Sequence, residues 1–237
     1  MKNLRLPVKL NQEIAAFVQS LKKIYREDLL SVILYGSGAS GEFVNNHSNL
    51  NILVLLKSTQ LSLLKKASEV IGRFKNLTPL FLTREFLLSS TDVFPIEFLD
   101  MQENYTVLDG QDILKEIQVD LKNLRFQCEQ ELKSKLLNLK QVYLNLNRQP
   151  ANLKEPLLKS FTSILHILRN VLRLKGIQPY YPKEDLLKQL AAHFKIDICH
   201  WEKIQAVKLK KIKINKIEIE ELFAILVDNL EKIVDAL

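Results

Sequence analysis

Three glycines lie close together before residue 42 and follow an apolar run, an arrangement that can cradle phosphate. The segment reads Gly36-Ser37-Gly38-Ala39-Ser40-Gly41, and it holds half of the six glycines in the chain. Small residues allow backbone N–H groups to approach phosphate oxygens, and Ser37 and Ser40 add hydroxyl donors. We expect these contacts with a bound nucleotide from Gly36, Ser37, Gly38, Ser40 and Gly41, and the alternative is a tight turn without a ligand.

The same spacing is the dinucleotide-binding fingerprint, but the surrounding residues do not fit that motif. The fingerprint requires a helix after the glycines and an acidic residue about 20 positions further on. Here the linker 42–50 is too short for a crossover helix with its turns, and Lys57 follows the next apolar run. A P-loop is excluded as well, because no Lys-Ser or Lys-Thr pair follows the glycines.

The glycines belong to a first region in which helical and strand patterns alternate. Apolar residues at helical spacing predict a helix that is capped by Asn11 and runs to about Tyr25. A further amphipathic helix is predicted at 61–74. Short apolar runs predict strands, which are expected at 29–35, 51–56, 79–83 and 95–101. We therefore expect an α/β (α+β) domain with a mixed sheet and covering helices.

The second region carries helical patterns and no strand signal. Long apolar stripes follow Asp120 and Pro156. A shorter helix is expected from Pro182 to about Phe194, and another after the cap residue Asp197. Asn215 and Glu218 form a capping-box-like pair before the last stripe. About five helices in this pattern predict an α-helical bundle.

Charge also separates the two regions. Residues 1–118 hold 13 of the 34 Lys and Arg and 13 of the 27 Asp and Glu, so residues 119–237 carry the whole formal net charge of +7. We place the domain boundary between these two ranges. A basic stripe runs from Lys208 to Lys216, with Lys203 before it, and could follow the phosphates of a nucleic acid. A solvated helix face is the commoner reason for such a stripe, and the sequence leaves its direction open.

The composition is that of a globular protein, with 47% hydrophobic and 26% charged residues. The apolar runs are too short to cross a bilayer, and the first residues lack the apolar segment of a secretory signal. Cys128 and Cys199 are far apart, and the four histidines have no metal-like spacing. A cytoplasmic location without a membrane partner is therefore expected.

The stretch from Leu34 to Leu56 resembles the signature of the polymerase-beta-like nucleotidyltransferases. That signature is a strand, then Gly-Ser-x-Ala-x-Gly, then Ser-Asp-x-Asp at the start of the next strand. The residue types that this signature requires are present at Gly36, Ser37, Ala39, Gly41 and Ser48. The helical C-terminal domain of kanamycin nucleotidyltransferase and of the minimal nucleotidyltransferases is similar to the second region. The resemblance implies a nucleotidyltransferase-like domain at 1–118, a helical bundle at 119–237, ATP or another nucleoside triphosphate as ligand or substrate, and Mg²⁺ as cofactor.

The chain departs from this signature at the paired aspartates, whose positions are occupied by Asn49 and Asn51. Residues two apart on a strand face the same way, so both amides would point at the nucleotide. The family uses the two carboxylates to hold Mg²⁺ against the triphosphate, and asparagine offers an oxygen without the charge. We expect Asn49, Asn51 and Glu97 at the metal position, with Mg²⁺ binding weak or lost. The alternative for the asparagines is turn chemistry at the end of a loop.

The segment from Pro95 to Asp100 looks like the strand that carries the third carboxylate of the family. Glu97 and Asp100 are three residues apart, so on a strand they would face opposite sides and only one could join the site. We predict Glu97 as the catalytic carboxylate, with Asp100 in reserve. The alternative for Glu97 is a surface or capping carboxylate.

Three functions remain open. The first is a nucleotidyltransferase-fold protein that binds a nucleoside triphosphate while transfer is weakened or lost. The second is an active Mg²⁺-dependent enzyme that modifies a small molecule or a protein, and the third is an RNA-binding or interaction module that uses the basic helical half. A nucleotide is the expected partner, the acceptor is open, and the helical domain is a candidate surface for a homodimer or a protein partner. Nucleic acid is less favoured.

Overall fold

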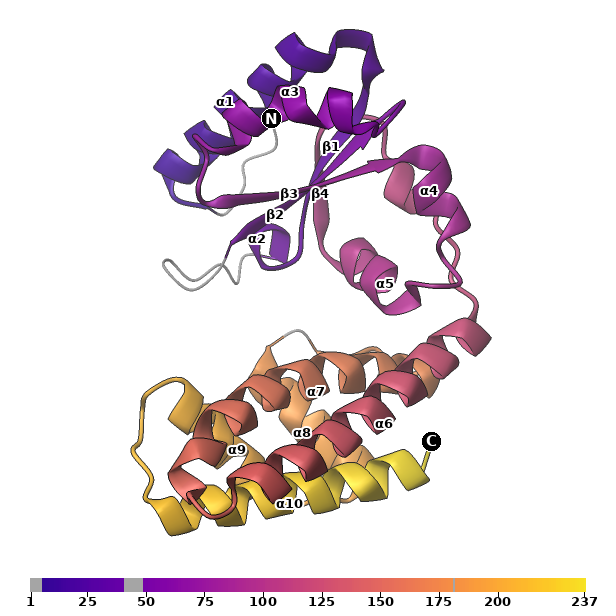
Figure 1. The fold of residues 1–237 in the computed structure, drawn as a ribbon. Helices are drawn as coiled ribbons and strands as arrows, with labels where there is room; N and C mark the ends of the chain where they lie inside the picture. The colour runs from indigo at the N-terminus through magenta and orange to yellow at the C-terminus, as the bar shows by residue number, and fades with distance from the viewer. Residues whose placement is uncertain (1–5, 41–48, 181) are drawn as a thin grey trace. The chain divides into compact units, whose positions relative to one another are not determined.

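The computed structural model describes residues 6–40, 49–180 and 182–237 of the chain. It divides into two compact units, Met1–Asp120 and Leu121–Leu237 (Figure 1). The first unit is a sheet with helices, and the second consists of helices joined by loops. Two residues of the predicted signature, Gly41 and Ser48, lie outside the described residues.

The first unit is built on a four-stranded mixed sheet with the strand order β3-β2-β1-β4. β1 pairs antiparallel with both β2 and β4, whereas β2 pairs parallel with β3. The strands are β1 (Leu29–Tyr35), β2 (Leu50–Leu56), β3 (Leu77–Thr83) and β4 (Tyr105–Gly110). The predictions of strands at 29–35, 51–56 and 79–83 are confirmed, and Pro79 is tolerated because β3 is an edge strand.

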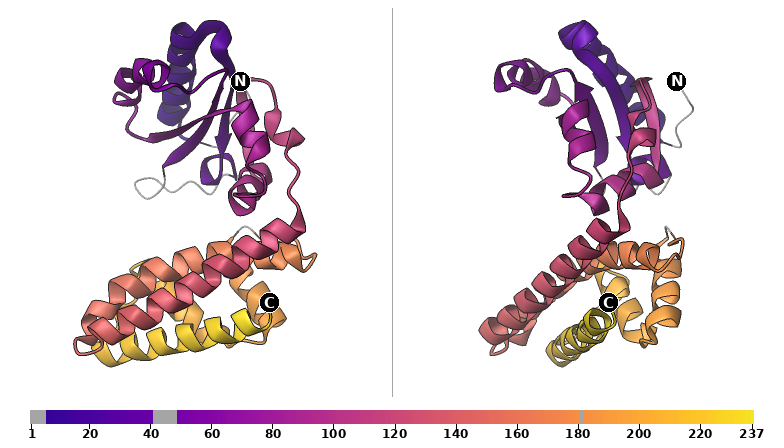
Figure 2. Two further views of the ribbon diagram at one scale, coloured as in Figure 1. Left: turned by 45° about the vertical axis from the view of Figure 1, so that its right-hand side comes forward. Right: turned by 90° about the vertical axis from the view of Figure 1, so that its right-hand side faces the viewer.

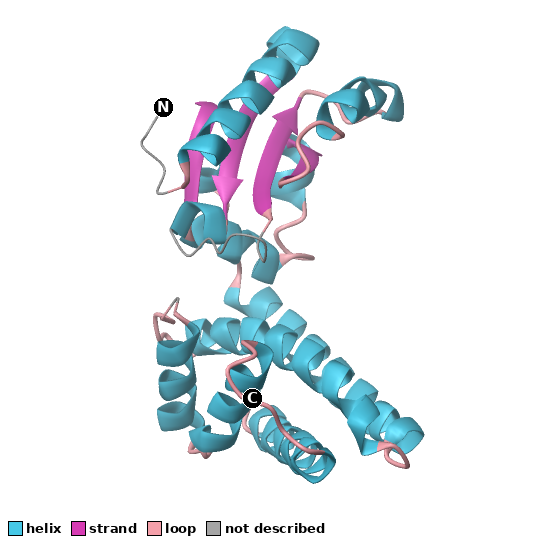
Figure 3. Ribbon diagram, turned by 90° about the vertical axis from the view of Figure 1, so that its left-hand side faces the viewer, coloured by secondary structure: helices cyan, strands magenta, loops and turns pink. Residues whose placement is uncertain are grey.

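Helices cover both faces of this sheet, as Figure 3 shows with α1 lying across the strands. On one face α1 (Val8–Tyr25) and α3 (Leu61–Ile71) pack on alternate strand residues such as Leu34 and Ile52. On the other face α4 (Arg84–Ser89) and α5 (Pro95–Glu103) pack on Ile33 and Leu53. Because the strands bury both faces, they read as continuous apolar runs.

The first helix begins earlier than predicted. α1 starts at Val8, directly after Pro7, and Asn11 lies within its first turn. The side-chain amide of Asn11 donates a hydrogen bond to the carbonyl oxygen of Leu6 at 3.0 Å. The prediction that Asn11 caps this helix was therefore wrong, and the start is set by the fixed backbone angle of Pro7.

The predicted strand at 95–101 was also wrong, because these residues form α5. Pro95 stands in the first turn, where a missing N–H costs nothing, and Glu97 adds negative charge near the helix start. The fourth strand of the sheet comes next along the chain, as β4, and it ends at Gly110. Two helices, α4 and α5, thus connect β3 to β4.

A bulge at the end of β4 depends on Gly110. Its φ is +80°, and a Cβ at this position would lie 2.1 Å from the carbonyl oxygen of Leu30. The pairing register shifts between Val32 and Ile33. The fully buried hydroxyl of Ser31 closes the bulge by donating to the carbonyl of Gln111 at 2.6 Å. No residue other than glycine fits here without a shift of the backbone.

The second unit contains five α-helices in the described residues, as the sequence predicts. They are α6 (Leu121–Leu146), α7 (Lys154–Leu174), α8 (Lys183–Phe194), α9 (Ile198–Lys208) and α10 (Lys216–Asp235), and a short 3-10 turn, η3 (Pro150–Leu153), leads into α7. Figure 2 shows α6 beside α7 and α10 in two views. No helix among the described residues is both long enough and apolar enough to cross a membrane.

Two predicted helix caps are present in this unit. The carboxylate of Asp197 accepts a hydrogen bond from the N–H of Cys199 at the start of α9, at 2.9 Å. At the start of α10 the side chain of Asn215 accepts from the N–H of Glu218, and Glu218 accepts from the N–H of Asn215 in return. This reciprocal pair is the capping box that the sequence predicts.

The basic stripe at 203–216 is not one helix face. α9 ends at Lys208, a loop follows, and α10 begins at Lys216. Lys203 forms an ion pair with Glu218 at 2.7 Å. Lys208 is half-buried against α7, where its ammonium donates a hydrogen bond to the hydroxyl of Thr162. Burial lowers the pKa of Lys208, and the positive charge of Lys183 nearby lowers it further. These two lysines thus contact neighbouring helices, while Lys210, Lys211 and Lys213 in the loop before α10 are exposed.

Candidate functional site

The glycine segment follows β1 directly and forms a tight turn into the one-turn helix α2 (Ser37–Ser40). Gly36 has a φ of +71°, which permits the sharp change of direction. Its N–H donates to the carbonyl of Asn104 at 2.9 Å, and its own carbonyl accepts from the N–H groups of Ala39 and Ser40. The turn is thereby tied to the start of β4.

Gly38 has a packing role in this turn. It is buried, and a Cβ on it would lie 2.7 Å from a methyl carbon of Leu50 and 3.2 Å from one of Leu34. Both leucines are fully buried strand residues. The small residue therefore lets α2 settle directly on the ends of β1 and β2, which the sequence alone does not indicate.

Hydrogen-bond donors without an acceptor within the described residues lie at the start of α2. Among the described residues, the N–H groups of Ser37 and Gly38 have no recorded acceptor, as is usual in the first turn of a helix. Ser37 is half-buried and its hydroxyl has no recorded partner there either, whereas the Ser40 hydroxyl lies 3.3 Å from the carbonyl of Ser37. The available donors thus centre on Ser37.

A row of polar side chains crosses the sheet beside this turn. Tyr35 on β1 lies directly opposite Asn51 on β2 and Tyr105 on β4. Residues opposite each other on neighbouring strands face the same side of a sheet, so the three side chains share one face. The amide nitrogen of Asn51 is 3.5 Å from the place where a Cβ on Gly36 would lie. This row therefore borders the glycine turn.

The two tyrosines were not singled out from the sequence. Burial raises the pKa of Tyr35. Burial also raises the pKa of Tyr105, and a hydrogen bond to Asp112 and the charge of that carboxylate raise it further. Both phenols are therefore neutral near pH 7, and the hydroxyl of Tyr105 is directed to Asp112. The residues from Tyr105 to Val107 have high β-sheet propensity, and this pattern could have placed Tyr105 on a strand.

None of the three side chains in the row is a carboxylate, and the carboxylate beside it is Asp112, the partner of Tyr105. On β4 the carboxylate of Asp109 forms an ion pair with Lys22 of α1 at 2.7 Å, and α1 covers the opposite face of the sheet. Asn49 is exposed just before β2, and Asn51 is half-buried within it. No cluster of three or more His, Cys, Asp or Glu suited to a metal occurs in the described part of the chain.

Glu97 and Asp100 lie on α5, which changes their geometry. The prediction put them on opposite faces of a strand, but three residues apart on a helix they lie on one face. Both side chains are half-buried, and both take part in interactions within the protein. Their role at the metal position stays a prediction.

The residue pair Cys199 and His200 offers no nucleophile. A hydrogen bond from the thiol to Asp197, and the charge of that carboxylate, raise the pKa of Cys199. The nearest acid to His200 is the same Asp197, at 3.4 Å from Nδ1. Asp197 thus serves the helix cap and keeps the thiol protonated.

Comparison with known proteins identifies the fold. No family model matches the chain, and no curated protein matches it in sequence. Among solved structures, spectinomycin adenyltransferase AAD(9) from Enterococcus faecialis, crystallised with ATP and spectinomycin, superposes with a TM-score of 0.61. The match covers 93% of this chain and 99% of that chain at 12% sequence identity. The fold is that of a nucleotidyltransferase. The shared fold extends over both units, because the match includes nearly the whole chain, and the fold expected from the signature is confirmed.

Proposed function

We propose that this chain binds a nucleoside triphosphate at the turn after β1, and that nucleotidyl transfer is weakened or lost. The N–H groups and hydroxyl at Ser37 would hold phosphate oxygens, together with the backbone at Gly36 and Gly38 and the hydroxyl of Ser40. Asn51 would face the nucleotide where the family has a metal-binding carboxylate. ATP is the nucleotide to test first, because AAD(9) was crystallised with it.

One observation carries the loss of transfer: none of the three side chains of the row, Asn51, Tyr35 and Tyr105, is a carboxylate. Mg²⁺ is a hard cation that proteins hold through carboxylates and substrate phosphates. Each missing carboxylate removes an attraction to Mg²⁺ of a few kcal/mol, even at an effective dielectric constant of ~20. In rate terms that corresponds to about two orders of magnitude or more for each lost charge. Neutral donors favour binding of the triphosphate without the metal.

A thermal-shift titration with ATP tests the proposal, because a ligand of the folded state raises the melting temperature with its occupancy. We expect a saturable shift of the same size in Mg²⁺ and in EDTA. Ser37→Ala should reduce the shift, and Ser20→Ala, on the exposed side of α1, should leave it unchanged. No shift with any of the four nucleoside triphosphates, or an equal loss in both variants, would refute nucleotide binding here.

The alternative is an active Mg²⁺-dependent nucleotidyltransferase acting on a small molecule or a protein. It is favoured by the match over both units to an adenyltransferase crystallised with ATP and spectinomycin. A thermal shift that requires Mg²⁺ would support it, and transfer of label from α-³²P-ATP to an acceptor would establish it. In that case Glu97→Gln should abolish transfer while ATP binding persists, with Asp100→Asn as the comparison.

A further inference from the structure

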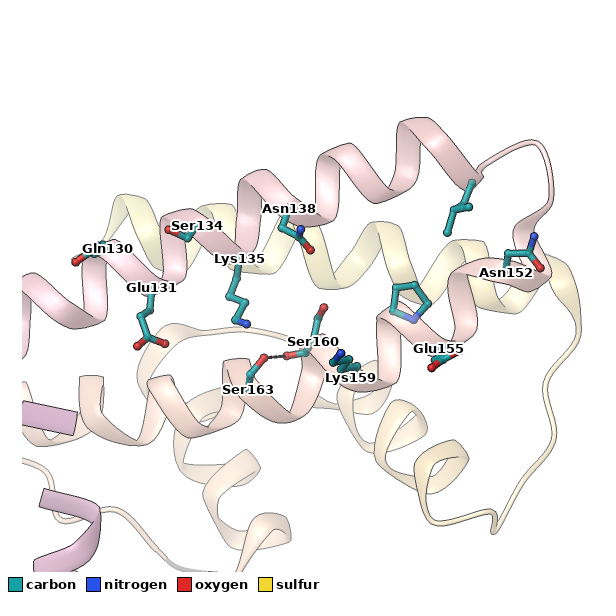
Figure 4. A pocket seen from close by; sticks show the side chains of 12 residues that line it. Gln130, Glu131, Ser134, Lys135, Asn138, Asn152, Glu155, Lys159, Ser160 and Ser163 are labelled. Carbon is teal, nitrogen blue, oxygen red and sulfur yellow. Dashed lines mark hydrogen bonds between the residues drawn. The ribbon is translucent and has the colours of Figure 1, made fainter. Parts of the chain in front are cut away.

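A polar groove lies between α6 and α7 in the helical unit, apart from the residues discussed so far. Its volume is about 840 Å³, which is in the range of small-molecule sites. Figure 4 shows its two walls, with Glu131 and Lys135 pointing from α6 toward α7. Small side chains, among them Ser160 and Ser163, leave the space between the helices open.

Four charged residues line this groove, two from each helix. Glu131 and Lys135 on α6 are four residues apart, as are Glu155 and Lys159 on α7. A glutamate four residues before a lysine is the arrangement that favours an ion pair on a helix surface. In the described chain neither pair is closed within 4.0 Å, and no acidic partner is recorded for Lys135 or Lys159. Lys135 is moreover half-buried, which makes an uncompensated cation more costly.

The charges follow a definite order along the groove. α6 and α7 run antiparallel through the short connection at η3, so Glu155 lies at the end nearest the connection and Glu131 lies at the far end. The two lysines lie between them, as the labelled side chains of Figure 4 show. The hydroxyl of Ser163 donates to the carbonyl of Ser160 at 3.0 Å, while the Ser160 hydroxyl has no recorded partner in the described residues. The centre of the groove is thus positive and rich in donors, and its ends are negative.

We propose that this groove binds a small phosphate-bearing molecule, with Lys135 and Lys159 as the pair that holds the phosphate. Two ammonium groups from facing helices and the Ser160 hydroxyl form charge-assisted hydrogen bonds to phosphate oxygens. The flanking Glu131 and Glu155 favour hydroxyl or amino groups on the rest of the ligand. They also repel a long polyanion, so the groove selects against nucleic acid. The proposal is independent of the nucleotide site in the first unit.

Site-resolved NMR with inorganic pyrophosphate as the probe tests it, at constant ionic strength set with NaCl. We expect saturable shifts of the amide signals at 134–138 and 159–163, separate from any shifts at 36–40. Lys135→Gln and Lys159→Gln should each weaken binding at the groove by about tenfold, the usual effect of losing one charge-assisted hydrogen bond. Ser160→Leu keeps every charge but fills the groove, and it should abolish the shifts.

The matched control is Lys133→Gln, which removes the same charge from the same helix outside the groove, where Lys133 pairs with Glu129 at 3.8 Å. It should change the groove affinity by less than about twofold, as expected for an exposed charge. An equal loss in Lys133→Gln would mean general attraction to the positive unit and would overturn the proposal. Absence of saturable shifts at millimolar pyrophosphate, or full binding by Ser160→Leu, would overturn it as well.

Discussion

Asn51 lies directly opposite Tyr35 in the antiparallel pairing of β1 and β2, and both side chains border the turn at Gly36. An amide therefore stands where the resemblance implies a metal-binding carboxylate, and a neutral phenol lies opposite it. Hydrogen-bond donors suit phosphate and sugar oxygens, whereas a divalent cation needs negative oxygen ligands. This pair leads to the first prediction.

Restoring the two carboxylates should restore Mg²⁺ binding. We expect the double change Asn49→Asp and Asn51→Asp to raise the affinity for ATP in Mg²⁺ by about tenfold or more, since each carboxylate adds a few kcal/mol of attraction to a cation in a partly buried site. In EDTA the same variant should bind ATP more weakly than the wild type, because the carboxylates then repel the triphosphate. Thermal shift or calorimetry measures both. Asn145→Asp, at an exposed position of α6, is the control for added negative charge alone. An unchanged Mg²⁺ dependence of ATP binding in the double variant would argue against this site.

Gly110 should be irreplaceable in the sheet. Gly110→Ala places a methyl group against the carbonyl of Leu30 at a φ of +80°, so we expect a loss of about 3 kcal/mol in the free energy of unfolding. Gly176→Ala is the matched control, because Gly176 has a φ of +72° but nothing within 4 Å of an added Cβ. It should lose only about 1 kcal/mol from backbone strain. Urea unfolding followed by circular dichroism compares the two, and equal losses would contradict the close contact at Gly110.

Glu218 should contribute stability at neutral pH and none in acid. A hydrogen bond from Lys203, then one from the backbone at Asn215, hold its pKa below the ordinary 4.5. A lowered carboxyl pKa stabilises the fold above the unfolded value, and this contribution disappears as the pH falls through the folded value. Glu218→Gln should therefore lower the melting temperature at pH 7 and have a progressively smaller effect as the pH falls below 4.5. The exposed Glu221→Gln serves as the comparison, and a pH-independent effect at Glu218 would contradict the ion pair as its cause.

Tyr35 should make the fold sensitive to alkali. Burial raises its pKa above the ordinary 10.0, so the folded state holds the phenol proton more tightly than the unfolded state does. The resulting stabilisation is complete below pH 10 and is lost as the pH rises through the folded value. Tyr35→Phe should reduce the fall in melting temperature above pH 10, whereas Tyr180→Phe, an exposed residue, should not change it. Ultraviolet titration of the phenols checks the same shift directly.

Local patterns in the sequence were sufficient for much of the fold. The central strands β1 and β2 are continuous apolar runs because both faces of the sheet are buried, and such runs can be recognised without a structure. The helices after Asp197 and Asn215 start at residues whose side chains satisfy their own first N–H groups, which is a local effect. The stretch from Leu34 to Leu56, together with the helical patterns of the second region, indicated the nucleotidyltransferase fold.

Other features depend on contacts between distant residues. Periodicity over seven residues such as 95–101 does not separate a helix from a strand, and in the structure this segment is α5 while β4 takes the place beside β1. Tyr105 meets Tyr35 through strand pairing over 70 positions of sequence, and Gly38 is small because Leu50 packs on it. The groove at Lys135 and Lys159 likewise exists only where two helices meet. Residue types and local spacing thus determined which elements form and which chemistry was available, while the tertiary structure decided which side chains share a site, because pairing register and packing act between residues far apart in the chain.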